Sequence, residues 1–112
     1  MLNHTVIVGR LVHDPELRMT ENGRKVTNIT LAVPRSFKNH EGEYDTDFIN
    51  CTLWQGIAEN TVQYVQKGDL LGVKGRLQTR NIELDSETKR NSVEVVAEKV
   101  TFLSGHKTKE DA

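Results

Sequence analysis

The amino-acid sequence predicts an all-β fold, a five-stranded barrel with one short helix between its third and fourth strands. Five segments alternate apolar and polar residues with the period of two that a strand imposes. Between the third and fourth of these segments, apolar residues recur at helical spacing. Short, sequential strands in an open sheet would leave their edges unprotected, so closure into a barrel is favoured. A flatter open sheet with the helix across one face is the alternative.

The first two strands are expected at residues 4–12 and 25–34. The segment HTVIVGRLV is rich in β-branched residues, and KVTNITLAVP alternates along its length. Between the two segments, Asn22-Gly23 is a turn signal. Pro34 cannot donate a hydrogen bond to a neighbouring strand, so it limits the second strand or places it at an edge.

The third strand, residues 46–55, follows a polar hairpin loop over residues 37–47 that has Gly42 near its tip. One face of this strand consists of Ile49, Cys51 and Leu53. The other face consists of Phe48, Asn50, Thr52 and Trp54. Because this second face mixes polar residues with the chain's only tryptophan, we expect a flat ligand to lie on it. Cys51, the single cysteine, is expected to be a small buried hydrophobe rather than a nucleophile.

The helix is expected within residues 56–68, where apolar residues recur at spacings of three and four and a lysine and a glycine supply a stop signal. The fourth strand, residues 69–84, contains two glycines that suggest a bend or bulge. The last strand, residues 92–103, follows a polar hairpin tip over residues 85–91.

Length and composition fit one domain, placed at residues 1–104, followed by a polar tail over residues 105–112 that is expected to be disordered. No apolar run is long enough for a membrane span and the N-terminus does not resemble a secretory signal, so we expect a cytoplasmic protein without membrane contact. The net charge of −1 argues against binding a polyanion by bulk charge alone, although cations outnumber acids in residues 1–40 and 62–82.

Cations and aromatic rings share the polar faces of the third and fourth strands. The cations on the fourth strand are Lys74, Arg76 and Arg80. Phosphates need cations and unpaired bases stack on rings, so this combination favours single-stranded nucleic acid with little sequence preference. Phe37 lies between Arg35 and Lys38 at the mouth of the hairpin loop, and an exposed ring between cations also fits nucleic acid.

Structural alternatives stay open for these residues. Phe48 and Trp54 could cover a second, minor core beneath the helix, or a subunit interface. Phe37 could anchor its loop. The cations of the fourth strand could guard an exposed sheet edge.

No enzyme site is indicated. The four histidines show no zinc-type spacing with each other or with Cys51, and no glycine-rich loop matches a nucleotide-binding pattern. The acidic residues of EGEYDTD fit a solvated hairpin tip better than paired catalytic carboxylates or a calcium site. We therefore expect no catalytic residue, no metal and no cofactor.

From Met1 to about Leu103, the chain resembles the bacterial single-stranded DNA-binding protein family. The resemblance is carried by five ordered motifs: MLNHTVIVGRLVHDPELR, NGRKVTNITLAV, DFINCTLW, AENTVQYVQKGDLLGVKGRLQTRN and VEVVAEKVTFL. It implies an oligonucleotide-binding fold, a five-stranded Greek-key barrel that assembles as a homotetramer. It also implies wrapping of single-stranded DNA during replication, recombination and repair.

The resemblance further implies roles for individual residues. Three match base-stacking positions: Phe37, Phe48 and Trp54. Ile82 stands where the family usually has an aromatic, so a base there would stack more weakly. The phosphate contacts would come from Arg35, Lys38, Lys74, Arg76 and Arg80. Because His4 stands where a cation is common and Met19 where an aromatic is common, a reduced affinity or site size is expected.

The C-terminus departs from that of the main replicative members of the family. Those proteins continue into a disordered linker and an acidic tip that recruits other proteins, whereas this sequence ends at KTKEDA. If that end is natural, we expect a short form without tail-mediated recruitment, similar to paralogues that coat DNA in natural competence or to a mobile-element version. A nucleoid-associated location is expected. A primosomal or other protein-interaction module on the same fold is the alternative function.

Overall fold

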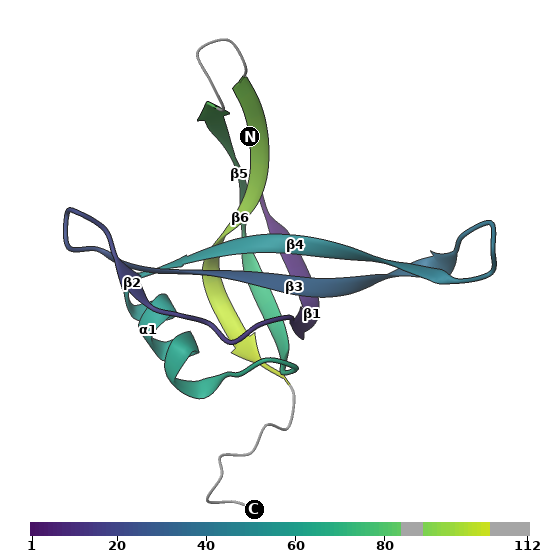
Figure 1. The fold of residues 1–112 in the computed structure, drawn as a ribbon, viewed down its shortest axis with the longest axis horizontal. Helices are drawn as coiled ribbons and strands as arrows, with labels where there is room; N and C mark the ends of the chain where they lie inside the picture. The colour runs from purple at the N-terminus through teal and green to yellow at the C-terminus, as the bar shows by residue number, and fades with distance from the viewer. Residues whose placement is uncertain (84–88, 104–112) are drawn as a thin grey trace, which may run out of the picture.

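Strands and one helix follow one another along the chain in the computed structural model, which describes residues 1–83 and 89–103. The elements in order are β1 (Thr5–Leu11), β2 (Arg18–Met19), β3 (Lys25–Lys38), β4 (Tyr44–Trp54), α1 (Gln55–Tyr64), β5 (Leu70–Glu83) and β6 (Lys89–Phe102), as Figure 1 shows. The five long strands and the helix correspond to the predicted elements. The two-residue strand β2 was not predicted.

The five long strands close into a barrel. The strand order is β1-β5-β6-β4-β3-β2, and β1 also pairs with β3, which completes the ring. The closing contacts pair Arg10 with Ala32 and Leu11 with Leu31. Only the β4–β6 pairing is parallel among the described strand pairs. The predicted oligonucleotide-binding fold is therefore confirmed, with α1 between the third and fourth long strands, β4 and β5.

The core lies inside the barrel and extends to the inner side of α1. Its buried residues include Leu11, Ile29, Leu31, Cys51, Leu53, Ala58, Val65, Leu71, Val73, Val95 and Ala97. Cys51 is a free, fully buried cysteine, and burial raises the pKa of its thiol to about 12. The prediction that Cys51 is a buried hydrophobe is confirmed.

A bulge interrupts the pairing of β5 with β6 where the sequence suggests one. The register shifts between Lys74 and Gly75. At Gly75 the backbone of β6 comes so close that a Cβ atom would collide with the carbonyl oxygen of Val96. Only glycine fits this approach, so the local sequence fixes where the barrel bends.

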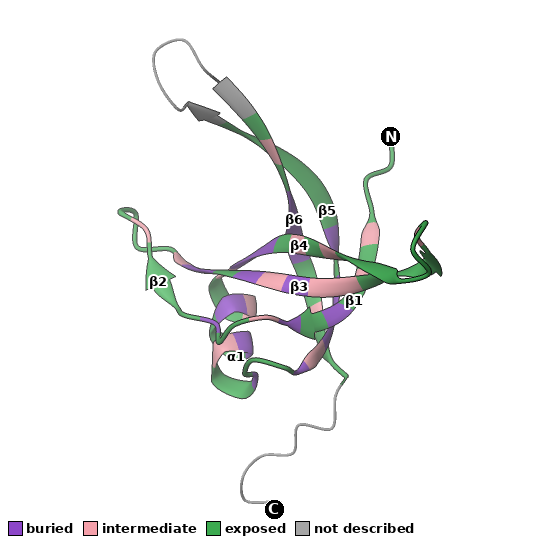
Figure 2. Cartoon of the chain, turned by 45° about the vertical axis from the view of Figure 1, so that its right-hand side comes forward, coloured by how far each residue is buried: buried purple, intermediate pink, exposed green. Residues whose placement is uncertain are grey.

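The predicted loop over residues 37–47 is wrong in extent. Strand β3 continues through Pro34 to Lys38, and β4 begins at Tyr44, so only residues 39–43 form the turn. Pro34 does not limit the strand, but the alternative prediction of an edge position is confirmed: in the described structure β3 pairs only with β4 at Pro34, and the register shifts between Pro34 and Lys38. Gly42 has φ 79° and lies in the turn as predicted. Beyond Pro34 on β3 and up to Asp47 on β4, the two strands form an arm that projects from the barrel (Figure 1) and is coloured mainly as exposed in Figure 2.

The remaining differences concern ends of elements. The helix ends at Tyr64, earlier than predicted, with Ala58 and Thr61 as its buried residues. The predicted hairpin tip lies partly in β6, which begins at Lys89, and its residues 85–88 lie outside the described residues. The predicted tail, residues 105–112, lies outside them as well. Within the described chain, the helix is too short and too polar to cross a membrane.

Candidate nucleic-acid interface

The strand pair β3–β4 presents an outer face that points away from the core. Residues directly opposite in an antiparallel pair project to the same side, and the register pairs Ala32 with Phe48, Thr30 with Asn50, and Asn28 with Thr52. We call the surface made by these residues and Trp54 the outer face. The sequence assigned the same four residues of β4 to one face: Phe48, Asn50, Thr52 and Trp54.

Two phenylalanine rings of the β3–β4 pair stand in solvent, one on the outer face and one on the arm. Phe48 is 65% exposed and Phe37, on the β3–β4 arm, is 66% exposed. Neither ring covers a second core within the described chain, and Phe37 lies in a strand instead of anchoring a loop. Exposed rings of this size are suited to stacking with a flat partner.

Trp54 is held differently. It is half-buried at the last position of β4, and the guanidinium carbon of Arg24 lies 4.2 Å from its ring centroid. The chain turns sharply into the helix at the next residue, Gln55, whose φ of 55° is in the left-handed region. The side chain of Gln55 accepts a hydrogen bond from the backbone nitrogen of Lys25 at 3.3 Å. These contacts fix the ring at the end of the outer face, with the Arg24 guanidinium stacked over it.

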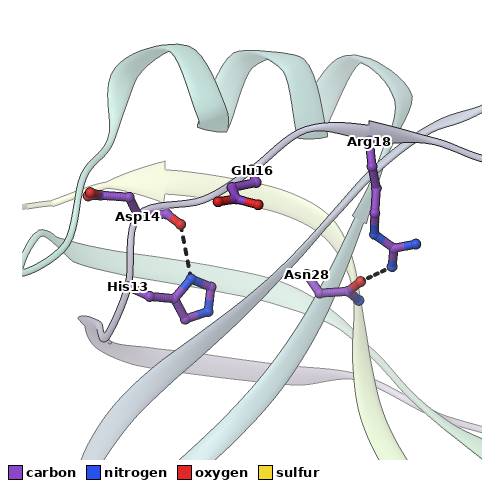
Figure 3. Close-up of a pocket in the computed structure, with 5 residues that line it drawn as sticks. All are labelled: His13, Asp14, Glu16, Arg18 and Asn28. Atoms are coloured by element: carbon purple, nitrogen blue, oxygen red, sulfur yellow. Dashed lines mark hydrogen bonds between the residues drawn. The ribbon is translucent and has the colours of Figure 1, made fainter.

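A series of hydrogen bonds crosses the middle of the outer face. Arg18 donates to the side-chain oxygen of Asn28, and Asn28 Nδ2 donates to Thr52 Oγ1 at 3.0 Å. The Thr52 hydroxyl donates to the carboxylate of Glu94, which also accepts from Arg80 Nη2 at 3.2 Å. We call these five residues the polar chain. Figure 3 shows its first link, between Arg18 and Asn28.

Two shallow hollows flank Asn28. The larger, about 530 Å³, is lined by His13, Asp14, Glu16, Arg18 and Asn28 (Figure 3). The second, about 280 Å³, is lined by His13, Asn28, Ile29, Thr30, Asn50, Arg80, Ser92 and Glu94. Most of the residues that line them have polar side chains. Together they extend the outer face across β3 and β4 toward Arg80 on β5.

Arg35 is already engaged by a carboxylate. Its Nη2 lies 2.9 Å from Asp47 Oδ1 and its Nε lies 3.1 Å from Asp47 Oδ2, while Asp45 is 3.9 Å away. The hydrogen bond with Asp47 raises the pKa of Arg35, and the same bond lowers the pKa of Asp47. A phosphate that binds Arg35 through this edge of the guanidinium has to displace Asp47.

The other predicted cations differ in their partners. Arg76 lies 3.9 Å from Glu98, and Arg80 contacts Glu94 in the polar chain. The Lys38 ammonium lies 5.8 Å from the centroid of the Tyr44 ring. Lys74 is exposed and forms no ion pair within the part of the chain that the structure describes. Lys38 and Lys74 are therefore more readily available to bind an anion than the three arginines, which already contact carboxylates.

The predicted site residues fall into two separate groups, and Lys74 and Arg76 on β5 line neither of the hollows beside these groups. Phe48 and Trp54 belong to the outer face, and Arg80 lines the hollow beside it. A separate group on the arm contains Arg35, Phe37 and Lys38, which line one hollow. The side chain of Ile82 lies outside the described residues, although its backbone pairs with Arg90.

Sequence reasoning missed Arg18, Arg24 and Glu94. Strand β2 has only two residues, too few for alternation to reveal it, so Arg18 and Arg24 were left in the connection between the first two predicted strands without a role. Glu94 offered a signal that was not used. It is a carboxylate within the apolar run VEVV, and an acid in such a strand is buried only with polar partners.

Comparison with known proteins gives matches over nearly the whole described chain. The model of the Single-strand binding protein family matches residues 2–103. Single-stranded DNA-binding protein B of Bacillus subtilis (strain 168) is 50% identical over 103 residues, which are 92% of this chain and 91% of that protein. Single-stranded DNA-binding protein A of the same strain is 53% identical over 92% of this chain and 60% of its own length.

A further relative, single-stranded DNA-binding protein 2 of Listeria innocua serovar 6a, is 53% identical over 92% of this chain and 65% of its own length. The chain thus spans less than two thirds of the length of several relatives and most of the length of another. The shared segment contains the whole barrel and the outer face.

Proposed function

The chain belongs to the single-strand binding protein family, and we propose that it binds single-stranded DNA without sequence preference, as a binding protein and not an enzyme. Bases would stack on the rings of Phe37, Phe48 and Trp54, and Lys and Arg side chains would contact the phosphates. This role would serve replication, recombination, repair or competence. The location proposed is the cytoplasm, in association with the nucleoid.

The observation that carries the proposal is the exposure of Phe48 on the same strand face as Trp54. Phe48 has 65% of its surface in solvent although it lies in the middle of a paired strand. Trp54 is six positions further along the chain, which is roughly 20 Å along a strand, so several nucleotides fit between the two rings. Stacking contributes about 1–3 kcal/mol per base and requires an unpaired base, which a duplex does not offer.

The proposed phosphate contacts divide into two kinds. Lys38 and Lys74 are free of carboxylate partners within the described residues, so they would bind phosphate directly. Three arginines each have a carboxylate within 4 Å: Arg35, Arg76 and Arg80. Each guanidinium would bind phosphate either beside that carboxylate or in place of it. Ile82 is retained as a proposed, weaker stacking position.

We also propose that the domain of residues 1–104 assembles as a homotetramer. Family membership supports an oligomer. Strand β1 adds support, because Val6 and Val8 are 71% and 47% exposed on it, and exposed β-branched residues on a strand favour contact with another protein surface. Native mass spectrometry should give four times the mass of the chain, whereas a monomer would contradict the assembly.

Titration of Trp54 fluorescence tests the proposed function. Trp54 is the chain's only tryptophan, so the signal reports on this position alone. Oligo-thymidine should quench it strongly at low and moderate salt, and a duplex of equal length should not. Equal, weak responses that vanish in salt would indicate generic charge attraction, and the rings would then be assigned to a protein interface.

A further inference from the structure

The polar chain takes one residue from each of five adjacent strands. Arg18, Asn28, Thr52, Glu94 and Arg80 lie on β2, β3, β4, β6 and β5, which is the order of those strands in the sheet. Four strand spacings separate its ends, roughly 19 Å across the sheet. A guanidinium stands at each end, and the strands themselves hold the residues between them.

All hydrogen bonds in the polar chain are directed toward Glu94. Arg18 donates to Asn28, Asn28 to Thr52, and Thr52 to the Glu94 carboxylate, which accepts from Arg80 on its other oxygen. Glu94 is therefore the final acceptor for both halves. Removal of its negative charge would weaken the acceptor on which both halves depend.

Burial distinguishes the middle of the polar chain from its ends. Thr52 is 1% exposed and Glu94 is 8% exposed, whereas the Arg80 side chain is 54% exposed. Arg80 contacts Glu94 through one nitrogen only, so most of its five N–H donors stay available. Arg35 differs, since two of its nitrogens contact Asp47. The geometry at Glu94 therefore orients an arginine without covering the guanidinium.

We propose that Glu94 is a positioning residue for single-stranded DNA: its carboxylate holds Arg80 directly, and Arg18 through Thr52 and Asn28, so that both guanidiniums meet DNA phosphates from fixed positions. This inference rests on the proposed function and adds Arg18 to the phosphate contacts. The proposed effect of Glu94 on affinity is the opposite of the effect expected from its charge alone. A carboxylate on a surface for a polyanion should weaken binding, but this one strengthens binding by ordering two cations.

The test compares Glu94→Gln with Glu98→Gln. Both changes remove one negative charge from β6, but Glu98 is a solvent-exposed partner of Arg76 at 3.9 Å. Affinity for a fluorescein-labelled oligo-thymidine is measured by anisotropy at two salt concentrations. Glu94→Gln should weaken binding roughly three- to tenfold, the loss expected when a charge-assisted hydrogen bond becomes a neutral one. Glu98→Gln should leave affinity unchanged or raise it up to about threefold.

A double-variant cycle separates positioning from a general loss of structure. In the Arg80→Gln background, Glu94→Gln should cost less affinity than in the wild type, because its main target is already absent. An equal loss in both backgrounds would overturn the inference. So would Glu94→Gln binding as tightly as the wild type, or more tightly. Thermal unfolding confirms that each variant is folded at the assay temperature.

If Glu94→Gln does not fold, Thr52→Val replaces it. This change preserves the shape of the side chain and the Arg80–Glu94 pair, while cutting the link from Glu94 to Asn28 and Arg18. Affinity should fall roughly two- to fourfold, and an unchanged affinity would overturn the inference. A wild-type protein that does not bind the oligonucleotide would instead refute the proposed function, so the two failures are distinguishable.

Discussion

Side chains of β4 point alternately to an inner and an outer face, and the two faces differ in what covers them. On the inner face, Cys51 and Leu53 are fully buried against the apolar core. On the outer face, Thr52 is buried by polar partners, and Phe48 remains mostly exposed. The chain itself buries the inner face, whereas the outer face keeps a ring that is 65% exposed in the described structure. Changes on the inner face should therefore alter folding, and changes at the outer rings should alter binding.

The largest contrast is expected in the chemistry of Cys51. Burial raises the pKa of its thiol from 9.0 to about 12, so the thiolate fraction at pH 8 falls roughly a thousandfold. A thiol reagent should react with the native protein only through opening of the barrel, and rapidly with the protein in denaturant. Fast labelling under native conditions would show that the inner face is open to solvent.

The same thiol gives a pH dependence of stability. Because the pKa of the Cys51 thiol is raised in the folded state, the protonated thiol favours folding. Its contribution to the free energy of unfolding is complete below pH 9.0, the pKa of an exposed thiol, and is lost as the pH rises toward about 12. Cys51→Ala should reduce this alkaline loss in denaturant titrations at several pH values.

Leu53→Ala should have the largest effect on stability among the β4 substitutions considered. Leu53 is fully buried, so the change should lower the free energy of unfolding by about 2–5 kcal/mol. Chemical denaturation measures the loss. The fraction that stays folded should bind oligo-thymidine with nearly wild-type affinity. A large loss of affinity in the folded fraction would mean that the two faces are not separable.

Trp54→Ala should weaken binding of oligo-thymidine by about 1–3 kcal/mol, because a stacked base would lose its ring. Some loss of stability is also expected, since Trp54 is half-buried under Arg24. The matched control is Tyr64→Ala, which removes a half-exposed ring that contacts Phe102 instead of the outer face. Anisotropy should show little change for the control. Similar losses for both rings would contradict a site at Trp54.

The smallest effect is expected from Asp47→Asn on the arm. This change frees Arg35 from the partner that a phosphate must displace, so affinity should rise by up to about threefold. The slope of the logarithm of affinity against the logarithm of salt concentration should steepen by about one, the value for one added phosphate contact. Glu43→Gln removes a charge from the same arm without releasing Arg35 and serves as the control. Equal gains in both variants would indicate general charge repulsion.

Much of the fold is predictable from the sequence because alternation reports directly on faces. The alternation of residues 46–55 assigned both faces of β4 correctly, and the glycines of β5 located the bulge. Of the two predictions for Pro34, the end of a strand is wrong and the edge position is confirmed, since among the described strands only β4 pairs with β3 at Pro34. Strand β2 is too short to leave a periodic signal.

The candidate site was less predictable, because a sequence shows which residues are charged and not which charges meet. Arg35 was assigned to phosphate without its pairing to Asp47, which comes from the neighbouring strand. Glu94 and Arg18 join the site through hydrogen bonds between residues far apart in the sequence. Such contacts depend on strand order and register, which alternation alone does not fix.

The most direct test of the account is Phe48→Ala, with unfolding free energy and oligo-thymidine affinity measured on the same protein. Phe48 is 65% exposed, so stability should change little, while affinity should fall by about 1–3 kcal/mol. That result would show that the outer ring serves a ligand. A clear loss of stability with unchanged affinity would contradict the account and assign the ring to the protein's own packing.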